Sequence, residues 1–256
     1  MSMEPISLKI IDLLSSPCVI GLLEQERADH NPLFGFIDEY MVGCDHVNYH
    51  REGDVWEHTK LVLQNIIKRP HDHIDVAAAL LHDVGKKHAL AANGGKNMAG
   101  HEIYSRQIAE KILEDWHFSY YDNIAILWLV ENHTKANDLV KCKSKYDAWI
   151  LTEHPYFDRL HNLAIADSAG TLGDDGKPLI DYDNALSKSI AGQCIGNKMP
   201  PPICDVDDFD VPDGYVDEAW RMAYKIQINS NLGFDHKGSI IRSVNNTIKQ
   251  QRNNHG

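Results

Sequence analysis

One short stretch decides the fold, and it reads Leu80-Leu81-His82-Asp83-Val84-Gly85-Lys86-Lys87. It closes a segment in which apolar residues recur with the spacing of one helical face, at Val76, Ala77, Leu80, Leu81 and Val84. The pattern predicts a helix over residues 75–84 that ends or kinks at Gly85. Two adjacent residues of metal-ligand type, His82 and Asp83, therefore lie at the buried end of this helix.

Four further segments repeat this arrangement of a polar residue on an apolar helical face. The predicted helices, each with its inward polar residue, are 55–68 with His58, 100–116 with His101, 121–133 with His133, and 159–170 with Asp167. A single histidine on an apolar face is usually a core residue with a satisfied hydrogen bond. Four inward histidines with two inward aspartates are different, because buried charge is costly unless it is paired or bound to a metal.

The ligand types favour a catalytic metal centre. Imidazole and carboxylate ligands suit first-row divalent ions, and the absence of thiolates disfavours a structural zinc site. One ion could take His58, His82, Asp83 and Asp167. A second could take His101, His133 and the other oxygen of Asp83, which would make Asp83 a bridge. We expect one or two divalent ions as cofactors, from among Mn, Ni, Co, Mg, Fe and Zn.

Two ions about 3.5–4 Å apart activate a bridging water and hold the oxygens of a phosphoryl group, so the pattern favours phosphoester hydrolysis. Lys86 follows Asp83 by three residues on the same predicted helical face. Its ammonium could bind the substrate phosphate and stabilise charge that develops on it. The alternative is an ordinary surface lysine beside Lys87. The candidate catalytic residues are accordingly Asp83 and Lys86.

The residue pattern divides the whole chain into three zones. Residues 1–45 predict a helical lead-in, residues 46–170 an all-helical core, and residues 171–256 an acidic loop followed by carboxy-terminal helices. The predicted fold class is therefore all-α, a helical bundle with a helical carboxy-terminal appendage. The acidic run at residues 205–213 lacks the spacing of a calcium-binding loop and indicates a solvated face.

Charge and cysteine content narrow the functional classes. The 256 residues carry a formal net charge of −12, which disfavours tight binding of long nucleic acid because phosphate contacts supply most of that affinity. The five scattered cysteines predict reduced thiols. No apolar run approaches the roughly 20 residues of a membrane span, and the amino end lacks the features of a secretory signal. We expect a cytoplasmic protein without a membrane partner; the pattern predicts no oligomeric state.

The combination of His58, His82-Asp83 and Asp167 resembles the signature of the HD superfamily of metal-dependent phosphohydrolases. His101 and His133 resemble the added ligands of its six-ligand variant, whose members can hold two metals. The run that ends in Thr59, His-Arg-Glu-Gly-Asp-Val-Trp-Glu-His-Thr, is similar to one in the carboxy-terminal HD domain of bacterial tRNA nucleotidyltransferases, the CCA-adding enzymes. The resemblance covers about residues 46–170 and implies an HD-domain helical bundle.

The resemblance also implies an enzyme with phosphatase or 2′,3′-cyclic phosphodiesterase activity on a small nucleotide or an RNA end. Arg51 replaces the proline of the related run, and residues 1–45 do not resemble a nucleotidyltransferase head, so we do not expect CCA addition. Gly85-Lys86-Lys87 stands where the HD hydrolases of guanosine tetraphosphate carry an acidic pair, which disfavours that substrate. Two alternatives stay open: a non-catalytic metal- or nucleotide-binding regulatory module, and a di-iron HD oxygenase.

Overall fold

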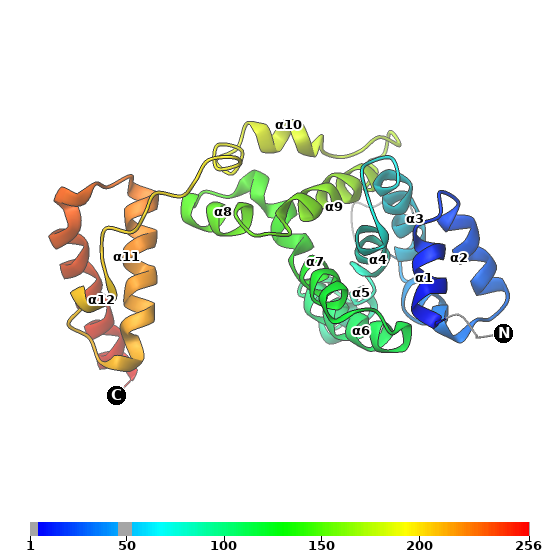
Figure 1. The fold of residues 1–256 in the computed structure, drawn as a ribbon, viewed down its shortest axis with the longest axis horizontal. Helices are drawn as coiled ribbons and strands as arrows, with labels where there is room; N and C mark the ends of the chain where they lie inside the picture. The colour runs from blue at the N-terminus through cyan, green and yellow to red at the C-terminus, as the bar shows by residue number, and fades with distance from the viewer. Residues whose placement is uncertain (1–4, 46–52, 256) are drawn as a thin grey trace. The chain divides into compact units, whose positions relative to one another are not determined.

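The computed structural model describes residues 5–45 and 53–255. In these ranges the chain is helical, with two isolated β-bridges and no strand, so the predicted all-α class is confirmed (Figure 1). No helix among the described residues is long and apolar enough to cross a bilayer. The family-like run begins at His50-Arg51-Glu52, and these three residues lie outside the described part, as does the predicted start of the core at residue 46.

The described chain forms α-helices separated by short turns and single-turn helices. The α-helices are α1 (Ile6–Leu14), α2 (Val19–Ala28), α3 (Val55–Ile66), α4 (His73–Leu81), α5 (Lys86–Ala92), α6 (His101–Trp116), α7 (Tyr120–Asp138), α8 (Lys145–Thr152), α9 (Phe157–Gly170), α10 (Tyr182–Ser187), α11 (Val216–Ser230) and α12 (Lys237–His255). The shorter helices are η1 (Pro32–Phe34), η2 (Ile37–Met41), η3 (Leu139–Lys141), η4 (Val206–Asp208), η5 (Asp213–Tyr215) and η6 (Phe234–His236).

The chain forms two compact units. The first comprises the described residues of Met1–Asp138 and Pro155–Ala185, and the second those of Leu139–His154 and Leu186–Gly256. Within the first unit, α3 packs along α9, α4 packs against α3 and α7, and α7 packs against α6 and α9. Every residue predicted to bind metal lies on these helices or in the turn between α4 and α5. The bundle therefore positions the whole candidate site within one unit.

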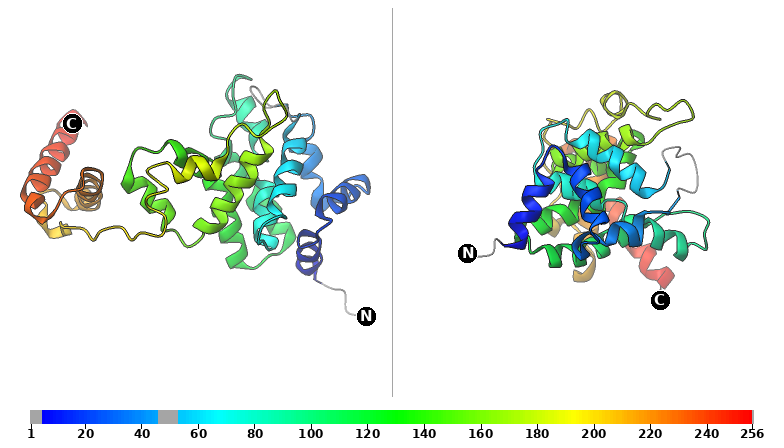
Figure 2. Two further views of the ribbon diagram at one scale, coloured as in Figure 1. Left: turned by 90° about the horizontal axis from the view of Figure 1, so that it is seen from above. Right: turned by 90° about the vertical axis from the view of Figure 1, so that its right-hand side faces the viewer.

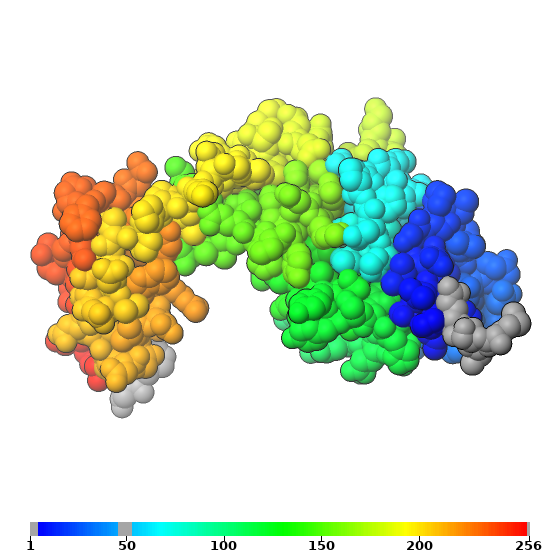
Figure 3. Space-filling view, in the orientation of Figure 1, coloured from blue at the N-terminus to red at the C-terminus, as the bar shows by residue number. Residues whose placement is uncertain are grey.

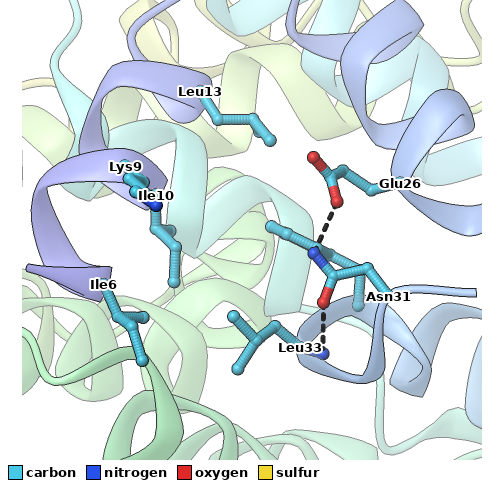
Figure 4. Close-up of a pocket in the computed structure, with 8 residues that line it drawn as sticks. Ile6, Lys9, Ile10, Leu13, Glu26, Asn31 and Leu33 are labelled. Carbon is cyan, nitrogen blue, oxygen red and sulfur yellow. Dashed lines mark hydrogen bonds between the residues drawn. The ribbon is translucent and has the colours of Figure 1, made fainter. Parts of the chain in front are cut away.

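The α1–α2 segment covers part of this bundle, where α1 contacts α4 and α2 contacts α3 (Figure 3). Trp116, at the end of α6, is completely buried, and the ring of Phe34 lies 5.8 Å from it between centroids. A cavity of about 270 Å³ beside η1 is lined mainly by apolar side chains such as Ile10 and Leu13 (Figure 4). None of the predicted site residues lines it.

The second unit has a small apolar core of its own. Helices α11 and α12 run side by side (Figure 2) and bury Ala219, Ala223, Ile240, Val244 and Ile248 between them and the neighbouring loop. Helix α8 joins this unit through the ion pair of Lys225 with Asp147, at 2.8 Å. These contacts group residues 139–154 with the carboxy-terminal helices, whereas the sequence placed them in the core zone. The zone boundaries at residues 45 and 170 stay predictions.

The two ends of α4 determine where His82 and Asp83 lie. Asp72 caps the amino end, where its Oδ1 accepts a hydrogen bond from Ile74 N at 2.9 Å, and Asp75 Oδ2 accepts one from Asp72 N at 3.0 Å. The helix ends at Leu81, three residues earlier than predicted. The prediction that His82 and Asp83 belong to this helix is therefore wrong, and both lie in the turn that leads into α5.

Candidate metal centre

Asp83 lies at the centre of the site, and its two carboxylate oxygens face different pairs of histidines. Oδ2 lies 3.1 Å from His82 Nε2 and 3.5 Å from His58 Nε2. Oδ1 lies 3.0 Å from His101 Nε2 and 3.6 Å from His133 Nε2. The Asp83 side chain is only 2% exposed. One buried carboxylate is thus shared between two histidine pairs.

Asp167 on α9 completes the first of these groups. Its Oδ1 lies 3.0 Å from His58 Nε2 and 3.9 Å from His82 Nε2. The structure therefore brings together all six residues that the sequence singled out as metal ligands. Two sets of them have potential ligand atoms within 4.8 Å of one another, namely His58, His82 and Asp83, and Asp83, His101 and His133.

A tight helix contact holds the turn that carries Asp83. The backbone N–H of Gly85 donates to Ser105 Oγ on α6, at 2.9 Å. A Cβ atom at Gly85 would lie 2.5 Å from the carbonyl oxygen of His101 and closer still to the backbone nitrogen of Ser105. Only glycine therefore allows the start of α5 to meet the start of α6 here, and this contact places Asp83 beside His101.

Backbone carbonyls orient three of the four imidazole rings. His82 Nδ1 lies 2.8 Å from Ala79 O, His101 Nδ1 3.0 Å from Met98 O, and His133 Nδ1 2.7 Å from Val130 O. A carbonyl oxygen can only accept, so each Nδ1 carries a proton and donates. In the neutral form of such a ring, the lone pair of Nε2 faces the centre of the site, as in histidines that bind metal.

This orientation gathers several Nε2 lone pairs around the Asp83 carboxylate. His101 Nε2 and His133 Nε2 lie 3.0 Å apart, which sets two lone pairs against each other in the neutral tautomers. Among the described residues, the buried His82 Nε2 also has no hydrogen-bond partner. Buried polar atoms are normally satisfied. A cation that accepts these lone pairs would resolve both features, so the donor set fits a divalent metal.

Both buried aspartates are ionised. Burial raises the pKa of Asp83, but the nearby His82, Lys86, His101 and His133 lower it by more, so it stays well below its usual range. For Asp167, burial likewise raises the pKa, and the hydrogen bond with His58 together with His82 lowers it by more. The site thus contains two buried carboxylates whose negative charge could balance that of bound cations.

Lys86 lies within the site and not on the surface. Its side chain is 10% exposed, and its Nζ lies 2.5 Å from Asp83 Oδ2. The neighbouring Lys87 is exposed and donates from Nζ to Glu39 O at 2.6 Å. The sequence identified Lys86 through its i, i+3 spacing from Asp83, and this contact is made although the intervening residues form a turn.

Asn137 is a residue of the site that the sequence analysis missed. Its Nδ2 donates to Asp167 Oδ2 at 2.7 Å. The predicted helix stops at His133, whereas α7 continues to Asp138. Asn137 follows His133 by four residues and so shares its face of the helix. That spacing is the signal that could have revealed it.

Comparison with known proteins identifies the domain that contains this site. Residues 44–168 match the family model described as HD domain, so the chain contains an HD domain over this range. The match includes all six clustered residues, from His58 to Asp167. A search of curated proteins found no match to the chain. An HD domain with a buried His/Asp cluster indicates divalent-metal binding and a metal-dependent hydrolase.

Proposed function

We propose that this protein is a metal-dependent phosphohydrolase that cleaves phosphomonoester or 2′,3′-cyclic phosphodiester bonds of a nucleotide or an RNA end. The observation that carries the proposal is the position of Asp83 in the HD domain, with one oxygen toward His58 and His82 and the other toward His101 and His133. The resemblance of the run ending in Thr59 to CCA-adding enzymes supports the cyclic phosphodiester class. The net charge of −12 favours small substrates.

In this proposal the chain's own residues bind and orient the reactants. The first ion would be held by His58, His82, Asp83 and Asp167, and the second by His101, His133 and Asp83. Bound divalent ions would supply Lewis-acid activation of a water for attack on phosphorus. The anchored imidazoles hold their Nε2 atoms toward the ions, and Asp83 supplies one oxygen to each half of the site. Lys86 lies beside Asp83 and donates to the negative oxygens of the transferred phosphoryl group.

Lys86→Ala is expected to reduce turnover by about 10²–10³-fold, the cost of removing one well-placed donor from developing charge. Metal content should stay at the wild-type value, because the ammonium is not a ligand. Steady-state hydrolysis and elemental analysis of the same preparation measure both quantities. Lys87→Ala is the matched control, since Lys87 is exposed and its Nζ donates to the backbone oxygen of Glu39, away from Asp83. A wild-type rate for Lys86→Ala, or loss of metal, would contradict the role proposed.

The two-ion arrangement predicts selective loss of metal. His101→Ala and His133→Ala should each lose about one equivalent and retain the other, because these residues complete only the second ligand set. Elemental analysis measures the equivalents. His71→Ala is the control, because His71 also bonds a carbonyl through Nδ1, that of Arg69 at 2.7 Å, but lies outside the cluster. A single equivalent in the wild type that both variants keep would exclude these histidines as ligands.

A substrate screen tests the proposed function directly. The purified protein would be loaded separately with Mn, Co, Ni, Fe, Zn or Mg, and offered phosphomonoesters, 2′,3′- and 3′,5′-cyclic nucleotides and dinucleotides. Hydrolysis of a nucleotide or an RNA end by the loaded protein and not by the metal-free protein supports the proposal. Metal binding without hydrolysis would instead indicate a regulatory module. Oxygen consumption by the iron-loaded protein would indicate a di-iron oxygenase.

A further inference from the structure

We infer that Asn137 is a positioning residue of the metal centre, which orients Asp167 toward the first ion without contacting the ion itself. The inference rests on the metal site of the proposed function and names a residue that neither the sequence motif nor the cluster of candidate ligands contains. It is carried by the contacts of Asp167, by the orientation of the Asn137 amide and by the place of Asn137 on α7.

Two helices hold the Asp167 carboxylate, one at each oxygen. Oδ1 lies 3.0 Å from His58 Nε2 on α3, and Oδ2 accepts from Asn137 Nδ2 on α7 at 2.7 Å. The second contact fixes rotation of the carboxylate about its Cβ–Cγ bond. With Oδ2 held by α7, Oδ1 stays directed at His58 and His82. The Asp167 side chain is only 11% exposed, so these contacts are largely shielded from water.

The chemistry of the contact fixes the orientation of the amide. Nδ2 donates to Asp167 Oδ2, so Nδ2 faces Asp167 and the amide Oδ1 faces away. In that orientation Asn137 Oδ1 is buried and has no hydrogen-bond partner among the described residues. A buried acceptor without a partner costs about 1–3 kcal/mol. Fold stability alone therefore does not explain this orientation of the amide. A role in orienting Asp167 as a ligand does explain it.

Helix α7 thereby serves both halves of the site. His133 faces Asp83 Oδ1 in the second ligand group, and Asn137, one turn later, reaches Asp167 in the first. Both residues lie on the face of α7 that packs toward α9 and α4. Loss of the Asn137 amide should therefore weaken the first ion only, which distinguishes positioning from a general defect of the helix.

The test is a titration of metal-free protein with Co²⁺, followed by visible absorption and by competition with a chelator. Asn137→Leu should weaken the first ion about 10- to 100-fold, the usual effect of losing a hydrogen-bond partner of a ligand, and leave the second unchanged. Asn137→Asp should weaken it as well, because it lacks the N–H donor and sets a second carboxylate against Asp167. Asn137→Gln keeps the donor and should restore part of the affinity.

Asn65→Leu provides the matched control. Asn65 is a half-buried asparagine on α3 whose Nδ2 donates to Leu61 O at 2.9 Å, away from the ligands. Unchanged Co²⁺ affinity in Asn137→Leu would overturn the inference. Parallel weakening of both ions together with a lower unfolding temperature of the metal-free protein would also overturn it, because that pattern marks a structural role. Weakened binding of the first ion in a protein that hydrolyses nothing would refute the proposed function and leave this inference intact.

Discussion

Asp83→Ala is expected to abolish hydrolysis and to remove both metal ions. Losing a hydrogen-bond partner of one ligand already costs about 10- to 100-fold in metal affinity. Asp83 is itself a ligand in both proposed sets, so the loss of affinity should exceed 100-fold for each ion. Its carboxylate also supplies the negative charge that faces four imidazoles. Elemental analysis and the hydrolysis assay measure the two effects, and His82→Ala should lose activity and the first ion.

Circular dichroism of the variant separates loss of the site from loss of the fold. The matched control is Asp75→Asn, since Asp75 is also a buried aspartate but pairs with Arg159 at 2.6 Å, at the other end of α4. Asp75→Asn should lower the unfolding temperature and keep its metal, whereas Asp83→Ala should lose its metal while it remains helical. Wild-type activity in Asp83→Ala would refute the proposed site.

Gly85→Ala is expected to destabilise the protein by about 3 kcal/mol, at the upper end of the range for overpacked interiors. The added Cβ would collide with the backbone of α6 at His101 and Ser105, and backbone cannot move aside as a flexible side chain can. Relief of the collision requires α5 and α6 to separate, which would draw His101 away from Asp83. Chemical denaturation of the metal-free protein measures the first effect, and Co²⁺ titration measures the second as weakened binding of the second ion.

Gly21→Ala is the control for this substitution. Gly21 lies within α2, and a Cβ atom there would have no neighbour within 4 Å. Alanine should therefore stabilise the protein by roughly 0.5–1 kcal/mol, because glycine is the poorer residue inside a helix. Opposite signs for the two substitutions would identify the α5–α6 contact as the cause. Equal stability of Gly85→Ala and the wild type would show that this contact is not tight in solution.

The apolar faces of the predicted helices made most of the candidate site predictable. Four candidate ligands each share a helical face with buried apolar residues, namely His58, His101, His133 and Asp167. The helical period of 3.6 residues was therefore enough to predict that their side chains point inward. The end of α4 was not predictable in this way, because the buried Val84 continues the apolar pattern of the helix beyond Leu81, its last residue. The chain leaves the helix there so that Gly85 can meet α6, and that contact joins residues about 20 positions apart in the sequence.

Contacts between distant segments account for what the sequence did not indicate. Asn137 and Asp167 are 30 residues apart and meet only because α7 packs against α9. The grouping of α8 with α11 likewise depends on Lys225 and Asp147, which are 78 residues apart. No pattern within a short stretch of sequence predicts contacts between residues so far apart. The candidate ligands were therefore recognisable by residue type, whereas Asn137, which contacts one of them, required the packed structure.

The carbonyl anchors of the histidines have a consequence for how quickly the site can be loaded. His82, His101 and His133 each bond the carbonyl of the residue three positions earlier, so each ring is held by its own segment of backbone. Immobilising a side chain costs about 0.5–1.5 kcal/mol, and here that cost is incurred while the chain folds. A divalent ion that binds here would meet rings that already point at it, so ordering of these rings would not slow its uptake.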